Sequence, residues 1–425
     1  QMCISDRSIS LQKIGQYGTI FHIRFVVLKS IQFWFQKKNL ENAKEKGEQG
    51  MENKVSMANV VKFAGAYVAC AIGSGFATGQ EIMQFFTAQG VMSILGSIVT
   101  MVVFAWAGGM FMRHGKELQL KVPGAIVRYY FGHTVGKIFE ILFQAFLYAI
   151  FVIMISGAGA TLAEYYGINP YVGRVGMTLA AFFTVILGLH KLTDILGSLG
   201  TVIIVFSVGV GLISFMGNAG GLGHAAEVIP TLEITKNSGG WLFSSILYPG
   251  FNAIAVLIFS AGIGASANSS KEALYGGLLG GVLFGLAILC MNLGLLVNIE
   301  SVYDKAVPSL VLADNIHRAV GVVFSVILIC GIYTTAVPML WGVTSQFAQE
   351  KTKKFMVVAL ILTVIAFFLG MTDFKVLVNT IYPFSGYMGI ILMVVVLYHM
   401  LFDKRDKAEV GAALNAKYKK LEQQQ

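Results

Sequence analysis

The carboxylate of Glu81 stands in a long apolar stretch, AYVACAIGSGFATGQEIMQFF, at residues 66–86. An ionised side chain at the centre of a bilayer costs about 2.5 to 3.5 kcal/mol on insertion scales, and such groups usually face a cavity and mark an ion pathway. Three roles suit Glu81: a gate together with Gln80, a proton acceptor, or an interface carboxylate that is exposed to water. Which of these roles applies depends on the segments that surround Glu81.

Two glycines, Gly73 and Gly75, interrupt the same stretch just before Glu81. A helix that is interrupted in hydrocarbon leaves peptide groups unsatisfied, at several kcal/mol each, unless a polar guest binds them. Glycine allows the chain to leave helical dihedrals and lets a ligand approach the backbone. The sequence predicts a second interruption at YPGFN, where Pro249 removes a donor and Gly250 permits a turn.

The composition is that of an all-α polytopic membrane protein. Of 425 residues, 56% are hydrophobic and 12% charged, and the mean hydropathy is +0.72, which leaves too little polar surface for a soluble globule. The four Cys have no paired or metal-like spacing, so we expect neither a disulfide nor a cofactor. The net charge of +9 lies in loops between apolar runs, which argues against nucleic acid as a partner and for membrane topology.

Apolar runs of the required length, about 20 residues, predict ten membrane crossings. They lie near residues 56–86, 91–112, 138–163, 172–189, 192–215, 241–265, 275–299, 319–347, 355–370 and 376–402. With both termini in the cytoplasm, most Lys and Arg fall inside, and the outside set is only Arg174, Lys236, Lys305, Arg318 and Lys375. The positive-inside rule therefore predicts cytoplasmic termini, with a basic tail at residues 403–425, in a bacterial plasma membrane.

The predicted spans divide into two halves of similar length, at about residues 56–215 and 241–402. Five helices in each half make the halves face opposite ways across the membrane, which predicts a five-plus-five inverted repeat within one domain at residues 51–425. In this repeat the first span of each half is discontinuous, and matching broken helices are the sequence pointer to a transporter site.

The first fifty residues differ in character from the rest of the chain. Residues 1–50 mix charged and aromatic residues without sustained periodicity, and Lys46-Gly47-Glu48 can be encoded by a purine run like a ribosome-binding site just before Met51. We therefore expect a non-native or disordered extension with the natural start at Met51. A cytoplasmic amphipathic tail is the alternative.

From about Met51 to Phe402 the chain resembles a known class of transporters. The stretch GAYVACAIGSGFATGQEIMQFF is very similar to the first span of the YkvI-type uncharacterised bacterial membrane proteins, and the ten spans look like the LeuT-type fold of the amino acid, polyamine and organocation transporter superfamily. The resemblance implies transport by alternating access. It does not imply a particular substrate.

The resemblance also implies a coupling ion. Sodium-coupled members hold Na+ between carbonyls of the first break and a hydroxyl pair on span eight, and here Gly331, Thr334 and Thr335 match the second part of that pattern. Ala69 and Ile72 would supply the carbonyls. The alternative is that the two hydroxyls only bond a preceding carbonyl. Phe76 replaces the Asn of a second sodium site, and span five lacks the Lys of certain proton-coupled relatives.

The solute is expected beside this ion. Its anionic group would bind the free amides around Ser74, Gly75 and Phe76, while residues of the second break and of span three would form the opposite wall, namely Tyr248, Phe251, Asn252 and Tyr148. Ordinary helix packing is the alternative for each aromatic residue. Glu140, Asp194, Asn292 and Asn379 are expected to pair locally or to bridge helices.

The leading interpretation is a Na+-coupled symporter for an amino acid or a similar small organic solute in contact with membrane lipid, with the oligomeric state left open. A proton-coupled transporter that uses Glu81 is one alternative. A solute sensor on the same fold, which binds without turnover, is another. A channel is disfavoured because no ring of like charge lines a pore, and no catalytic constellation indicates an enzyme.

Overall fold

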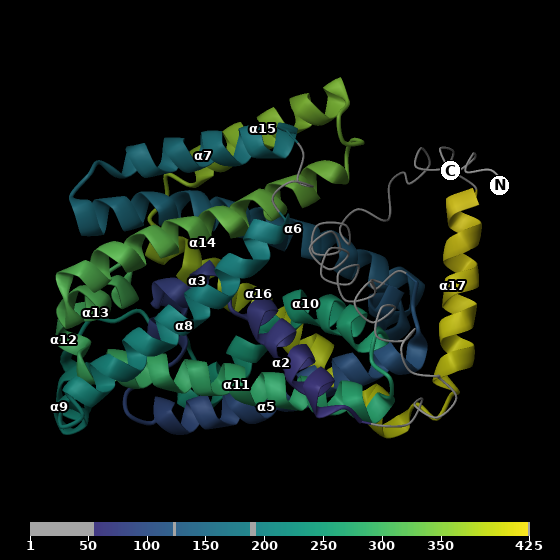
Figure 1. Cartoon of the computed structure of the whole chain (residues 1–425), viewed down its shortest axis with the longest axis horizontal. Coiled ribbons are helices and arrows are strands. Elements are labelled where there is room, and N and C mark those ends of the chain that lie inside the picture. Colours follow the sequence, from purple (N-terminus) through teal and green to yellow (C-terminus); the bar gives the residue numbers. More distant parts are fainter. Residues whose placement is uncertain (1–54, 122–124, 188–192, 424–425) are drawn as a thin grey trace, which may run out of the picture.

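A computed structural model describes residues 55–121, 125–187 and 193–423, and these form helices without strands (Figure 1). The expectations for residues 1–50 and for the Asp194 side chain lie outside what it describes. The elements are α2 (Met57–Ala71), α3 (Ser74–Thr78), α4 (Gln80–Phe85), η1 (Thr87–Gln89), α5 (Ser93–Leu118), α6 (Ala125–Tyr166), α7 (Pro170–Leu187), α8 (Thr193–Gly217), α9 (Gly221–Val228), η3 (Ile229–Thr231), α10 (Gly240–Ala265), α11 (Ser270–Val297), α12 (Ile299–Val302), α13 (Pro308–Ile316), α14 (Arg318–Ser345), α15 (Lys353–Leu369), α16 (Phe374–Phe402) and α17 (Lys407–Gln423).

Several of these helices match the thickness of a membrane. In the described part of the chain, 6 helices are long and apolar enough to cross it, and the number rises to 8 if each of two bent pairs counts as one span. The helices α2, with 15 residues, and α15, with 17, fall short of that length. The count of ten crossings therefore stays a prediction.

The helix contacts repeat when the two halves of the chain are exchanged. The helices α5 and α11 pack along each other and α7 and α15 lie together, while α17 stands at one end of the molecule (Figure 1). Four further kinds of contact occur once in each half: α2 on α11 and α10 on α5, α6 on α7 and α14 on α15, α7 on α14 and α15 on α6, and α6 on α16 and α14 on α8. This pattern is the one that the inverted repeat predicts.

Glycines allow the central helices to approach closely. A Cβ atom on Gly108 in α5 would come within 2.8 Å of the Gly277 carbonyl oxygen in α11, and one on Gly280 would lie 2.8 Å from Tyr67 Cβ in α2. Small residues at such contacts let helix backbones pack in lipid, where the hydrophobic effect does not drive association. The glycine-rich composition thus serves helix packing.

The first span is discontinuous in two places. The helix α2 ends at Ala71, Ile72 and Gly73 are extended, and α3 begins at Ser74. Gly79 then takes a left-handed conformation, with φ of 78°, between α3 and α4. A side chain at Gly79 would be strained, and its Cβ would come within 2.9 Å of the Ser309 amide nitrogen in α13. The junction between α3 and α4 therefore needs glycine both for its backbone dihedrals and for its close contact with α13.

The discontinuity in the sixth span does not lie where the sequence predicted it. Helix α10 continues through Pro249, and its direction changes by 59° between residues 240–254 and 256–265. Proline removes the N–H that would bond the Ser245 carbonyl, but Thr100 Oγ1 donates to that carbonyl at 2.6 Å. Gly250 makes no turn: its Cβ would lie 2.5 Å from the Gly386 carbonyl oxygen, so this glycine lets α16 pack closely.

Candidate functional site

Glu81 lies in the first turn of α4, and only 5% of its surface is exposed. The Tyr248 hydroxyl, from α10, donates a hydrogen bond of 3.1 Å to Glu81 Oε2. The Tyr382 hydroxyl, from α16, also bonds this carboxylate. Residues from three helices that are far apart in sequence therefore meet at one buried acid. The water-exposed interface carboxylate that the sequence left open is not what the structure shows.

Gly75 provides the space for this carboxylate. A Cβ atom at Gly75 would overlap Glu81 Oε1 and would lie 3.0 Å from the Tyr382 hydroxyl. The sequence predicted that a ligand approaches the backbone here, and the group that does so in this structure is the protein's own carboxylate. Phe76 turns away, with its ring 5.9 Å from that of Phe284.

Aromatic rings surround the hydroxyl pair. Phe251 stacks on Tyr382, with ring centroids 4.6 Å apart and planes 13° apart, and its centroid lies 5.4 Å from that of Tyr248. Phe85 contacts Tyr248 edge to face at 5.2 Å. On the α6 side, Phe146 meets Phe251 at 6.3 Å. The wall is thus aromatic and carries a carboxylate and two hydroxyls.

No Lys or Arg in the described residues faces Glu81 as an ion-pair partner: its polar neighbours are the two tyrosine hydroxyls. The buried cationic side chain of Arg128 binds Glu140 instead, through contacts of 2.9 and 3.0 Å. Buried carboxylates are usually paired or neutralised because desolvation of the charge is expensive. Glu81 therefore has the chemistry of a receptor for a positive charge or a proton.

Two of the predicted wall residues are placed differently. The Tyr148 hydroxyl donates to the Leu362 carbonyl in α15 at 2.8 Å, which directs it away from Tyr248. Two positions earlier, on the opposite side of α6, Phe146 takes the place that was predicted for Tyr148, because residues two apart in a helix do not share a face. Asn252 is buried and bonds the Tyr248 carbonyl at 3.2 Å, within its own helix.

The predicted sodium ligands show local hydrogen bonds. Thr334 Oγ1 and Thr335 Oγ1 donate to the Gly331 carbonyl at 2.9 and 3.0 Å. That geometry is the alternative that the sequence left open for these hydroxyls. Ala69 is exposed and Ile72 is buried at the end of α2. The described residues hold no group of three or more His, Cys, Asp or Glu that could bind a metal, and the sodium set stays a prediction.

Polar contacts join α3 and α4 to the neighbouring segments on the side of α13. Ser309 donates to the Ala77 carbonyl at 2.5 Å, and Gln84 Nε2 bonds Asn237 Oδ1 at 3.2 Å. Gln80 is buried, and its Oε1 has no hydrogen-bond partner in the described part of the chain. Asn292 accepts from Thr87 at 2.9 Å, which confirms its expected role as a bridge between helices. Gln84, which the sequence analysis missed, is thus buried in α4 together with Gln80 and Glu81.

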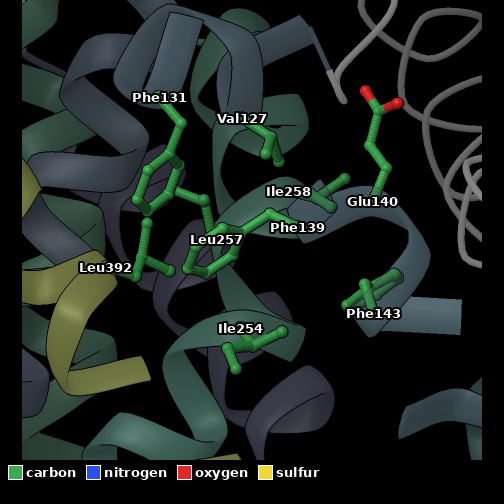
Figure 2. Close-up of a pocket in the computed structure, with 9 residues that line it drawn as sticks. All are labelled: Val127, Phe131, Phe139, Glu140, Phe143, Ile254, Leu257, Ile258 and Leu392. Atoms are coloured by element: carbon green, nitrogen blue, oxygen red, sulfur yellow. The ribbon is translucent and has the colours of Figure 1, made fainter. Parts of the chain in front are cut away.

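A small apolar pocket lies on the other side of the aromatic wall. It begins at Ile254, one helical turn after Phe251 in α10, and the α10 end beyond it leads toward α17. Figure 2 shows apolar side chains around it, while the Glu140 carboxylate points away. The lining residues are Val127, Phe131, Phe139, Glu140, Phe143, Ile254, Leu257, Ile258 and Leu392. Glu140, which was expected to pair locally, has Arg128 as its partner, twelve positions earlier in the chain.

Tyr382 is the functional residue that sequence reasoning missed most clearly. A signal was present, because Tyr382-Pro383 in the middle of the last span repeats the Tyr248-Pro249 pair of the sixth. Only the packing of α10 against α16 brings the two tyrosines to the same carboxylate.

Comparisons with known proteins bear on the family and the fold of this chain. The chain is 25% identical over 341 residues to the uncharacterised membrane protein YkvI of Bacillus subtilis, an alignment that covers 79% of this chain and 94% of YkvI. The chain is homologous to YkvI. It is also 25% identical over 336 residues to YyaD of Bacillus subtilis, covering 78% of this chain and 94% of that protein. No model of a protein family matches the sequence.

Solved structures that resemble this chain include a manganese transporter. A single-site mutant of the Eremococcus coleocola manganese transporter matches with a TM-score of 0.53 at 14% identity, over 87% of this chain and 94% of that one. MhsT in complex with L-phenylalanine matches with a TM-score of 0.50 at 14% identity, over 84% and 91%. At these identities the likeness establishes the LeuT-like fold of a YkvI-type multi-pass membrane protein.

Proposed function

We propose that this protein is a secondary active transporter that moves a small organic solute, an amino acid or a related amine, by alternating access. It would act in a bacterial plasma membrane with both termini in the cytoplasm, and Na+ would drive uptake. The observation that carries the proposal is the buried Glu81 beside the broken first span, at the meeting point of α3, α10 and α16. In a LeuT-like fold this midpoint is where solutes bind.

The two sides of this site differ, as alternating access requires. Toward α13 the chain is closed by the contact of Gly79 with Ser309 and by the Gln84–Asn237 pair. Toward α17 the apolar cavity begins one turn from Phe251. This asymmetry supports a pathway that opens to one side at a time.

Transport is tested by counterflow in proteoliposomes that contain the purified full-length protein. Labelled L-phenylalanine, L-leucine, 2-phenylethylamine and isoamylamine are offered outside against unlabelled solute inside. We expect accumulation of at least one label in protein-containing vesicles and none in protein-free vesicles. A solute that stabilises the protein in thermal shift but is never exchanged would contradict transport and favour a sensor.

Sodium coupling rests on the span-eight residues Gly331, Thr334 and Thr335 together with the first break. Oxygen ligands suit a hard cation, and hydroxyls that donate to the Gly331 carbonyl keep lone pairs that can face an ion. We expect Na+-dependent thermal stabilisation in the natural protein and its loss in the double variant Thr334→Val, Thr335→Val. Thr344→Val is the matched control, because Thr344 makes the same kind of local bond to the Leu340 carbonyl further along α14. Sodium-dependent stabilisation that persists in the double variant would remove this ion site.

Glu81 favours one second candidate, coupling to protons. A buried carboxylate without a cationic partner can take up a proton instead of pairing with a charge. Uptake that follows an imposed pH gradient in the absence of Na+, and that is lost in Glu81→Gln, would support this candidate. Uptake that follows only a sodium gradient would exclude it.

A further inference from the structure

We infer that the solute recognised at Glu81 is an organic cation: a small amine whose ammonium group pairs with this carboxylate and which carries no carboxylate of its own. This inference rests on the proposed function and specifies its substrate class. The observations behind it are the position of Glu81, its hydrogen-bond partners, and the rings around it.

The first observation is that Glu81 fills the place where a solute carboxylate was expected. Its Oε1 lies so close to the Gly75 backbone that a Cβ atom there would overlap it, next to the Tyr382 hydroxyl. A second carboxylate at this break would lie within a few ångströms of the Glu81 carboxylate, and the two groups would repel each other when both are ionised. Like-charge contacts of this kind cost several kcal/mol. The site therefore rejects an amino acid and accepts its decarboxylated counterpart.

The second observation concerns charge balance. Within the described residues, Glu81 is bonded by the neutral hydroxyls of Tyr248 and Tyr382, and the buried guanidinium of Arg128 is taken by Glu140. Two neutral donors leave the net negative charge of an ionised carboxylate in place. A cationic solute would neutralise it, and an ammonium group would also supply hydrogen bonds to oxygen.

The third observation is the aromatic wall. Beside the carboxylate, the ring centroid of Phe251 lies 5.4 Å from that of Tyr248 and 4.6 Å from that of Tyr382. Aromatic faces attract ammonium groups by about 0.5 to 2 kcal/mol, more when the pair is removed from water. The apolar remainder of an amine would lie against Phe251 and Phe146, on the way to the cavity that begins at Ile254. A carboxylate flanked by aromatic rings fits an amine whose remainder is apolar.

The test compares solutes that differ only in their charged groups. One set is 2-phenylethylamine, L-phenylalanine and 3-phenylpropionate, and the other is isoamylamine, L-leucine and 4-methylpentanoate. Binding to the purified full-length protein is measured by thermal shift and calorimetry in Na+ and again in K+. The variant is Glu81→Gln, which keeps the shape and removes the charge. The control is Glu300→Gln, because Glu300 is exposed and pairs only with His224 at the surface.

We expect at least one amine to bind the natural protein and the Glu300→Gln protein at least about 30-fold more tightly than its matched amino acid, with no binding of the acid. Truncating one partner of a buried charge pair costs about 2 kcal/mol or more, so Glu81→Gln should weaken amine binding by about 30-fold or more. Normal melting of Glu81→Gln without solute would show that the loss is not one of folding. If that variant melts early, Tyr382→Phe is measured instead, and it should weaken amine binding while the amino acid stays unbound.

Three results would overturn the inference. They are tighter binding of the amino acid than of the amine, amine binding that survives Glu81→Gln, and stabilisation through Glu81 by Na+ or K+ alone with no amine bound. The proposed function fails separately: amines that bind through Glu81 but show no counterflow would sustain the inference and contradict transport. Exchange of an amino acid without amine binding would support transport and contradict the inference about the amine.

Discussion

The Tyr248 hydroxyl donates a hydrogen bond of 3.1 Å to Glu81 Oε2, which ties the middle of α10 to the second half of the broken first span. In an alternating-access cycle these two segments would carry the solute site between them. A polar contact between them, rather than only apolar packing, lets a bound solute or proton change how firmly they are held together.

Removal of the tyrosine hydroxyls should weaken solute binding without unfolding the protein. Hydrogen bonds to charged groups contribute about 1.5 to 3 kcal/mol, so Tyr248→Phe and Tyr382→Phe should each weaken binding of the transported solute by about tenfold or more. Tyr148→Phe is the matched control, because its hydroxyl bonds the Leu362 carbonyl away from Glu81. Calorimetry on the three variants checks this, and equal losses in all three would contradict the site.

A methyl group at Gly75 should disable the site. Its Cβ would overlap the Glu81 carboxylate, and overpacking of this kind costs about 1 to 3 kcal/mol. We expect Gly75→Ala to abolish counterflow or to lower its rate severalfold. Gly73→Ala lies in the same break, has φ of −99°, and meets nothing within 4 Å. If Gly73→Ala were as inactive as Gly75→Ala, the dihedrals of the break rather than the space for Glu81 would be decisive.

Thr100 should matter because of Pro249. The Thr100 hydroxyl donates to the Ser245 carbonyl, whose regular α-helical donor would be the N–H that Pro249 lacks. Thr100→Val should lower the free energy of unfolding by about 1 to 3 kcal/mol. In a Pro249→Ala background the restored N–H can bond Ser245, so the same change should cost less. A double-mutant cycle by thermal or denaturant unfolding measures this coupling, and additive effects would contradict it.

Asp403 should stabilise the junction between α16 and α17 throughout the range from pH 6 to pH 8. Hydrogen bonds from Arg405, followed by those from Lys407 and Tyr129, hold the pKa of this carboxyl well below its usual range. A group with a depressed pKa contributes its stability above its unfolded pKa and loses it only as the pH falls toward the lower folded value.

We therefore expect Asp403→Asn to lower the melting temperature by a similar amount between pH 6 and pH 8, at a cost of about 1 kcal/mol because Arg405 is exposed. Glu300→Gln, at a surface pair, is the control. A difference between natural protein and variant that appeared at only one end of this range would contradict this account.

The sequence by itself determined the class of fold and the place of the first break. Long apolar runs cannot leave peptide groups unpaired in lipid, so they predict helices, and Gly73 marks a point where helical dihedrals end. The sequence also identified Glu81, because a carboxylate within an apolar membrane segment is costly and usually marks a functional site. The periodicity of one helix is a local property, and these inferences needed nothing more.

Only the tertiary structure decided what Glu81 touches. Tyr248 is separated from it by 167 positions along the chain and Tyr382 by still more, and which faces of α10 and α16 meet depends on Gly250 and Gly386 packing against each other. For the same reason the sequence misread Pro249 as a break, since its cost is removed by Thr100 on a different helix. A side chain that bonds a backbone group or a buried carboxylate of a distant segment cannot be recognised from the local sequence pattern. The partners of Glu81 could therefore be identified only from the packing of the helices.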